Sequence, residues 1–319
     1  MILGNSNWEA SKLSSPPEGI INNSNGAKSA NQRFLIPFAD RELRRNHSDK
    51  INQLANQLGY CNSTKVFNGS RLPEMPGADW FKSRSCETIE LYLGESLTFE
   101  ATPLALPLVN RPSSNLLISG YNDAIHDGLL SSILQSLDAQ NDIDEIIYFN
   151  GRSIVSLGAF KYLNTFGKRP ISKHERLTTL NLVEIFDELQ QFKRVVIIDG
   201  LESIKDFHSG PASFRPMKKD DPPSPQESLK KILEDGPLQG TFVIAFADNW
   251  KRCNSSCKDL LGFFEMRVGF CMNEDDAGSF VSGAIGKLKG LEKDNRAVFA
   301  DRLKNQVIWF RPYINKENI

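Results

Sequence analysis

The sequence contains no long apolar run and few cysteines, and each of these features argues against a class of protein. No stretch of about 20 apolar residues occurs, so we expect no membrane-spanning helix. The first residues lack the basic and then apolar order of a secretory signal peptide. The 5 cysteines are odd in number and scattered, which favours reduced thiols in a cytoplasmic protein; they are Cys61, Cys86, Cys253, Cys257 and Cys271.

The chain also has almost no net charge. Its 38 lysines and arginines nearly balance 39 aspartates and glutamates, so the formal net charge is -1. No global positive field therefore attracts nucleic acid, and a DNA contact would need a local basic patch. The 4 histidines are dispersed, and Cys253 and Cys257 have no second Cys or His pair at zinc spacing, so we expect no metal cluster or catalytic triad.

The first third of the chain is predicted to form two regions. Residues 1–30 are rich in Asn, Ser, Gly and Pro and show little apolar periodicity, which indicates a flexible lead-in. Residues 31–110 are predicted to form a small α/β subdomain. Its elements are a strand at 32–38, a helix at 40–59, a strand at 65–67 and strands within 89–108.

Apolar strands and amphipathic helices alternate over residues 111–319. This alternation predicts a mostly parallel sheet covered by helices on both faces. Ser224 and Pro225 have the residue types of a helix N-cap and first helical position. The predicted strands are 115–119, 145–149, 194–198, 241–247, 265–271, 297–299 and 307–309, and the predicted helices are 126–139, 179–192, 225–235, 252–263 and 275–288.

A loop after the 115–119 strand has the context of a phosphate-binding Walker A loop, G-x-x-x-x-G-K-[ST], but not its residues. Counted from Gly120, Ile125 replaces the second Gly, His126 the Lys and Asp127 the Ser or Thr. A working loop needs Gly for close approach, Lys to neutralise phosphate and a hydroxyl to hold Mg²⁺. His126 is mostly neutral near pH 7, and Asp127 is negative and could itself cap the helix. An ordinary strand–loop–helix turn without a ligand is the alternative.

Two further strand ends carry polar residues. Asp199 follows four apolar residues, as the Mg²⁺-ordering Asp of a Walker B strand does. Gly200 stands where hydrolysing proteins usually carry the acid that positions water, and Glu202 lies two residues further on. Asn249 follows the 241–247 strand, and it could sense a γ-phosphate or cap the next helix.

Several segments in this order resemble a C-terminal ATPase-like domain of the FtsK/SpoIIIE superfamily, the DNA-pumping motors of bacteria. They are NLLISG at 115–120, RVVIIDGL at 194–201, residues 223–236, GTFVIA at 240–245, residues 264–276, residues 295–299 and WFRPY at 309–313. The resemblance covers roughly residues 32–313, and the order of the segments is more specific than any one of them. It is closest to proteins that chain several such domains, the last often with a decayed P-loop.

The resemblance implies a RecA-like (ASCE) P-loop NTPase fold that binds ATP and Mg²⁺ between subunits. It also implies a ring or tandem assembly, with double-stranded DNA in a central channel. By position, Gly120, His126 and Asp127 fall on Walker A, Asp199 on Walker B and Asn249 near the sensor. The missing Lys, hydroxyl and Walker B acid argue against independent hydrolysis, because phosphoryl transfer depends on charge stabilisation.

Three functional hypotheses follow from the sequence. The preferred one is a non-catalytic or weakly nucleotide-binding module that assembles with active ATPase domains, or as a homo-oligomeric ring, in a DNA-handling complex. The second is an active ATP-dependent DNA translocase in which Asp199 binds Mg²⁺ and Glu202 orients water. The third is a protein-binding scaffold in a secretion or defence complex, without DNA.

Overall fold

The chain divides into two compact units, Met1–Val66 and Phe67–Ile319. The structure is a computed structural model, and it describes residues 7–13, 18–24, 26–37, 40–60, 68–84, 88–140, 143–152, 171–174, 179–189, 192–208, 223–281, 288 and 290–315. The strand predicted at 65–67 lies outside these described residues.

The first unit contains a two-stranded hairpin and one long helix. Strand β1 (Glu18–Ile21) pairs antiparallel with β2 (Gln32–Leu35), and the short 3-10 helices η1 (Glu9–Lys12) and η2 (Lys28–Ala30) lie on either side of β1 in sequence. Helix α1 (Arg41–Gln57) starts where the Asp40 side chain accepts a hydrogen bond from the Leu43 N–H. The helix predicted at 40–59 is therefore present. The segment 1–30, predicted as a flexible lead-in, carries local structure in its described part.

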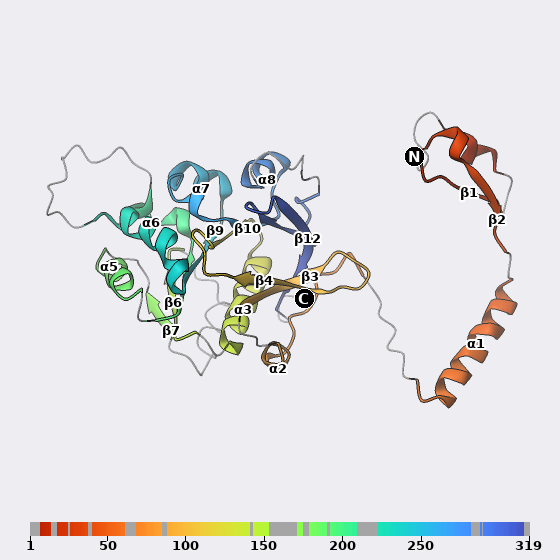
Figure 1. Cartoon of the computed structure of the whole chain (residues 1–319), viewed down its shortest axis with the longest axis horizontal. Helices are drawn as coiled ribbons and strands as arrows, with labels where there is room; N and C mark the ends of the chain where they lie inside the picture. Colours follow the sequence, from red (N-terminus) through yellow and green to blue (C-terminus); the bar gives the residue numbers. More distant parts are fainter. Residues whose placement is uncertain are drawn as a thin grey trace. The chain divides into compact units, whose positions relative to one another are not determined.

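The second unit is built on one 10-stranded sheet (Figure 1). Its spatial order is β4-β3-β12-β11-β10-β5-β9-β8-β6-β7. The strands are β3 (Ile89–Ser96), β4 (Pro103–Leu108), β5 (Leu116–Gly120), β6 (Glu145–Asn150), β7 (Ile171–His174), β8 (Arg194–Asp199), β9 (Thr241–Ala247), β10 (Met266–Phe270), β11 (Ala297–Asp301) and β12 (Gln306–Pro312).

The half of the sheet from β10 to β7 is parallel, and the half from β10 to β4 is antiparallel. Every residue of β5, β8, β9 and β10 is buried, which explains why these strands read as continuous apolar runs. β9 lies between β5 and β8, the strands that end at Gly120 and Asp199. The predicted mostly parallel α/β core is confirmed.

Helices cover both faces of the parallel half. On one face α3 (Asp123–Ala139) buries an apolar stripe that includes Leu130, Ile133 and Leu137. Each such side chain contributes about 1.5–3 kcal/mol of burial energy. The opposite face is covered by α5 (Thr179–Asp187), α6 (Pro225–Asp235), α7 (Trp250–Ser256) and α8 (Glu274–Val281). In α6, Ser224 and Glu227 form a capping box with Pro225 in the first turn, as the sequence indicates.

Strands β3 and β4 belong to the same sheet as the parallel core. β3 pairs with β12 and packs against α3, and its pairing with β4 shifts register between Tyr92 and Gly94. Two α3 side chains bind the backbone at this irregularity. The Ser136 hydroxyl accepts from the Tyr92 N–H at 3.0 Å, and the Ser132 hydroxyl donates to the Tyr92 carbonyl. These two bonds give hydrogen-bond partners to the Tyr92 backbone at the point where the pairing of β3 with β4 is irregular.

The sequence-based boundary near residue 110 therefore falls between two strands of one sheet, whereas the two compact units meet at Val66 and Phe67. The reason is tertiary: β3 and β4 bury one face against α3, which local patterning cannot reveal. Helix α2 (Ala78–Lys82) and β7 are further elements that the sequence analysis did not predict. Over the described residues, no helix is both long and apolar enough to cross a membrane.

Candidate functional site

Four loops meet at the carboxyl edge of the parallel strands. The register pairs Ser119 of β5 with Ala247 of β9, Phe246 of β9 with Asp199 of β8, and Asp199 with Asn150 of β6. The strands therefore end side by side. In open α/β sheets this edge is where ligands bind. It carries the predicted site residues Gly120, His126, Asp199 and Asn249.

Gly120 is explained by packing against its neighbouring strand. A Cβ atom at this position would lie 2.2 Å from the carbonyl oxygen of Phe270 in β10 and 2.4 Å from its ring. No L-amino acid with a side chain fits there without a shift. The glycine is therefore required by the β5–β10 contact, whether or not the loop binds phosphate.

The amino end of α3 is capped by the chain itself. Asn122 is the N-cap residue, and its side chain accepts a hydrogen bond from the Ile125 N–H at 3.1 Å. The expectation that Asp127 caps this helix is wrong, because the helix begins at Asp123 and Asp127 lies in its second turn, where it is buried. A helix amino end that already has a side-chain cap offers fewer free N–H groups to an anion.

His126 and Asp199 form a buried ion-pair contact. His126 Nε2 lies 3.0 Å from Asp199 Oδ1, and the two side chains are 4% and 3% exposed. The second oxygen, Oδ2, accepts a hydrogen bond from the Tyr148 hydroxyl at 2.7 Å. Phe246 packs on the imidazole with ring centroids 4.6 Å apart. The Tyr148 hydroxyl therefore hydrogen-bonds one carboxylate oxygen of Asp199. The contact of His126 with the other oxygen is an ion-pair contact without hydrogen-bond geometry, and among the described residues neither Nε2 nor Oδ1 has a hydrogen-bond partner.

The two partners shift each other's pKa in the direction of an ion pair. Burial alone lowers the pKa of His126, but the charge of Asp199 and its contact with the imidazole outweigh burial and raise it above 6.5. Burial alone raises the pKa of Asp199, but His126 and the Tyr148 hydroxyl lower it below 3.8. Burial and the neighbouring Asp199 raise the pKa of Tyr148, which keeps its hydroxyl a donor.

Arg152 forms a second group of ion pairs at the same edge of the sheet. The Arg152 Nε atom donates to Asp248 Oδ2 at 2.9 Å, and its Nη2 donates to Asp123 Oδ1 at 2.9 Å. Asp248 Oδ1 also lies 3.7 Å from His126 Nδ1. Arg152 thus joins the loop after β6, the start of α3 and the tip of β9.

Sequence reasoning missed Tyr148 and Arg152. Tyr148 reads as one more apolar residue of the 145–149 strand, and Arg152 lies in a loop without a motif. Their only sequence signal is position, because Tyr148 lies two residues before the carboxyl end of β6 and Arg152 two residues past it, near the level at which β8 ends with Asp199.

The Glu202 side chain forms a hydrogen bond with the backbone of Asn249. Glu202 Oε1 accepts from the Asn249 N–H at 2.9 Å, and the Asn249 side chain caps α7 by accepting from the Arg252 N–H. The alternative of Asn249 as a helix cap is confirmed. Burial raises the pKa of Glu202, whose other oxygen has no hydrogen-bond partner among the described residues.

A Mg²⁺–nucleotide does not fit this arrangement. The Asp199 carboxylate is buried beside His126 and Tyr148, which leaves little room there for a metal ion. The predicted Walker A positions carry His126 and Asp127 in place of the lysine and the hydroxyl that hold phosphate and metal. Within the described residues, no group of three or more His, Cys, Asp or Glu side chains is placed to hold a metal ion.

Comparison with known proteins finds similarity at the level of structure only. No protein-family model and no curated protein matches this chain. The cytoplasmic domain of EssC matches with a TM-score of 0.54 and 14% identity over 95% of this chain and 59% of that one. Thermomonospora curvata EccC (ATPases 2 and 3), in complex with a signal sequence peptide, matches with a TM-score of 0.52 and 12% identity over 91% and 52%.

The pCW3 conjugation coupling protein TcpA with ATPγS matches with a TM-score of 0.50 and 11% identity over 86% of this chain and 83% of that one. This chain therefore spans 59% and 52% of the lengths of the EssC and EccC chains. At such low identities the likeness establishes the fold alone. The chain has the P-loop ATPase fold of these proteins.

Proposed function

We propose that this chain is an FtsK-like module of a translocating assembly, with weak or no ATP hydrolysis of its own. The observation that carries the proposal is the state of Asp199. By its place in the sequence this residue corresponds to the Walker B Asp. It is buried, its Oδ2 accepts a hydrogen bond from Tyr148, and its Oδ1 lies 3.0 Å from His126 Nε2. In the site of an active ATPase, the carboxylate oxygens at this position bind Mg²⁺ and its water ligands.

Its partners would be active ATPase modules, supplied by the same polypeptide or by another one, in the cytoplasm. The fold neighbours support this kind of partner, because EccC is described as carrying ATPases 2 and 3 in one chain and this chain spans 52% of it. A module of this kind would complete the assembly and present surfaces to its neighbours, while the active modules supply the energy.

Steady-state ATP hydrolysis tests the catalytic part of the proposal. We expect the purified chain to show no turnover above that of its Asp199→Ala variant, with or without DNA. Turnover that is clearly present and is abolished by Asp199→Ala would contradict the proposal. The Tyr121→Phe variant is a suitable control, because Tyr121 lies at the same edge but its hydroxyl is 3.5 Å from Asp276 and does not reach Asp199.

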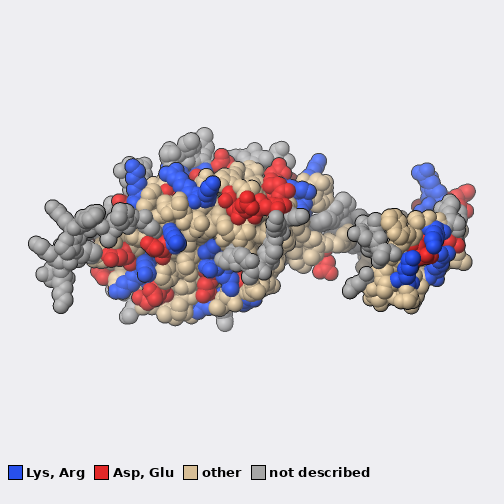
Figure 2. Space-filling model, turned by 90° about the horizontal axis from the view of Figure 1, so that it is seen from above, with Lys and Arg blue, Asp and Glu red and all other residues tan. Residues whose placement is uncertain are grey.

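A protein-binding scaffold is the second candidate. The candidate edge carries the carboxylates Asp123, Asp248 and Asp276, and Arg152 is already paired with the first two, so the described acidic side chains outnumber the cation there and disfavour phosphate. On the face of the second unit drawn in Figure 2, basic and acidic side chains are interspersed, a pattern that gives little attraction to a DNA backbone. EccC in complex with a signal sequence peptide is a protein of this fold that binds a peptide.

Binding to double-stranded DNA at low salt separates these two candidates. Phosphate contacts are strongest there, and their number sets how steeply affinity falls with salt. Salt-sensitive binding would support a DNA-handling module, and its absence would support the scaffold. An active translocase with Glu202 as its base has the least support, since that carboxylate is buried against the Asn249 backbone.

A further inference from the structure

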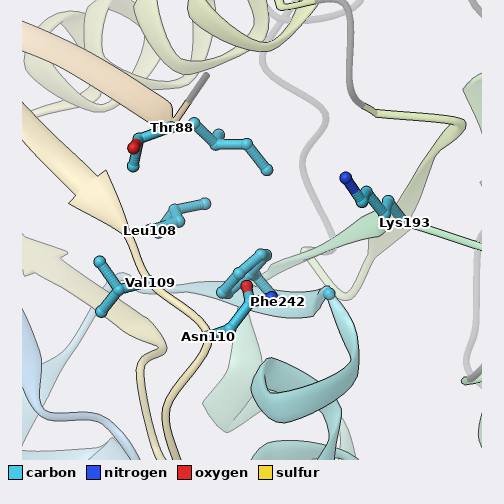
Figure 3. Close-up of a pocket in the computed structure, with 8 residues that line it drawn as sticks. Thr88, Leu108, Val109, Asn110, Lys193 and Phe242 are labelled. Atoms are coloured by element: carbon cyan, nitrogen blue, oxygen red, sulfur yellow. The ribbon is translucent and has the colours of Figure 1, made fainter. Parts of the chain in front are cut away.

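A separate cavity lies at the amino ends of β8 and β9, far along these strands from Asp199. Its volume is about 260 Å³, which corresponds to roughly nine water molecules at ~30 Å³ each. It is lined by residues at the start of β3, the end of β4, the approach to β8 and the start of β9 (Figure 3). These are Thr88, Ile89, Leu108, Val109, Asn110, Lys193, Gly240 and Phe242.

The lining is divided into an apolar floor and a polar rim. Ile89, Leu108 and Phe242 are buried and supply the floor. Thr88, Asn110 and Lys193 are exposed at the rim. Within this set of described lining residues there is one cation and no carboxylate. Compact pockets with an apolar body and a few placed polar groups are typical of small-ligand sites.

Hydrogen bonds fix the backbone at Lys193, the residue that carries the cation. The Lys193 N–H donates to the Asp144 carboxylate at 2.8 Å, and the Lys193 carbonyl accepts from the Asp144 N–H at 2.8 Å. The Gly240 carbonyl accepts from the Arg194 N–H at 3.1 Å. This bond holds the turn before β9 beside Lys193.

Gly240 also determines where the lysine stem lies. A Cβ atom on Gly240 would be 3.2 Å from Cγ of Lys193, and Gly240 has φ +84, a conformation that favours glycine. The aliphatic stem of Lys193 therefore packs against the Gly240 backbone, which has no side chain. Figure 3 shows the Lys193 nitrogen turned toward the space beside Leu108.

We propose that this cavity binds a carboxylate carried on a compact apolar body, about the size of one leucine side chain. The apolar body would displace water from Ile89, Leu108 and Phe242, and the carboxylate would lie at the rim against Lys193. An ammonium has three donor hydrogens, so a carboxylate can be added to the contacts that Lys193 already makes. The Asn110 amide can donate a further hydrogen bond.

Other ligand classes match the lining less well. Phosphate sites usually offer several donors, such as backbone N–H groups or arginines, whereas the cavity has one lysine and one amide. A neutral apolar ligand would gain nothing from the positive charge of Lys193. Two sources share the proposed chemistry: a free small carboxylic acid, and the carboxy-terminal residue of a peptide. The inference does not depend on the function proposed for the Asp199 edge.

Methyl-detected NMR titration of the full chain tests the proposal. The probes are 4-methylpentanoate, its neutral amide 4-methylpentanamide, acetyl-Gly-Leu with a free carboxylate, and the same peptide amidated. The reporters are the methyl groups of Ile89, Leu108 and Val109. The variant Lys193→Met keeps the stem and removes the charge, and Lys251→Met on the exposed surface of α7 is the matched control.

We expect saturable shifts of these methyl groups with a free acid, and affinity about tenfold lower for the amide and for Lys193→Met. Lys251→Met should bind as the natural chain does. Tighter binding of 4-methylpentanoate identifies a small molecule as the source, and tighter binding of the free-acid peptide identifies a chain end. The proposal is overturned by non-saturable shifts at millimolar probe, by equal binding of acid and amide, or by unchanged binding to Lys193→Met.

Discussion

The Tyr148 hydroxyl provides the cleanest perturbation of the candidate site. Tyr148→Phe removes one oxygen atom and leaves the ring in the core, where Tyr148 is 3% exposed. Asp199 Oδ2 then loses its 2.7 Å hydrogen bond and remains buried. Hydrogen bonds to charged groups contribute about 1.5–3 kcal/mol, and a buried acceptor without a partner keeps its desolvation penalty. We therefore expect a loss of about 1.5–3 kcal/mol in the free energy of unfolding.

Thermal unfolding followed by tryptophan fluorescence measures this loss, because Trp250 is buried beside the same sheet edge. For a unit of this size the expected fall in Tm is about 3–12 °C. Tyr121→Phe is the control, since its side chain is half exposed and its hydroxyl makes only a 3.5 Å contact. If the two variants unfold at the same temperature, Tyr148 does not hold Asp199 as described.

Three further perturbations test other parts of the structure. Because the pKa of His126 is raised above 6.5 and that of Asp199 is lowered below 3.8, the pair stabilises the fold fully between these pH values. The contribution of the pair is lost as the pH rises through the His126 pKa or falls through the Asp199 pKa. When the free energy of unfolding by urea is measured against pH, His126→Gln should remove the loss on the alkaline side. Ser136→Ala removes the acceptor of the Tyr92 N–H and should cost about 1–3 kcal/mol in urea unfolding. Gly120→Ala places a methyl group against Phe270 and should cost about 1–3 kcal/mol, whereas Gly278→Ala, whose Cβ would meet nothing within 4 Å, should not destabilise.

The strands of the core could be predicted because burial on both faces makes them continuous apolar runs. The 241–247 and 194–198 strands coincide with β9 and β8, and the Asp199 position follows from the end of β8. The placement of β3 and β4 could not be predicted in the same way. It depends on their packing against α3, which follows them in the chain, and on the bond of Ser136 to Tyr92, 44 residues apart.

The sequence predicts where the candidate site lies, but not which of its side chains contact one another. Sequence reasoning finds Gly120, His126 and Asp199, since each stands at a recognisable motif position. It does not find that His126 faces Asp199, because that contact joins residues from different elements across the sheet edge. Tyr148 and Arg152 carry no motif, and only the register of β6 with β8 brings them to Asp199 and Asp248.

Isothermal titration calorimetry with ATP and ADP, with and without Mg²⁺, tests the central claim most directly. If His126 and Tyr148 occupy the Asp199 carboxylate, the purified chain should show no saturable heat at millimolar nucleotide, and Mg²⁺ should make no difference. Micromolar binding that requires Mg²⁺ and is lost in Asp199→Ala would contradict it, because those oxygens would then be available to a metal ion.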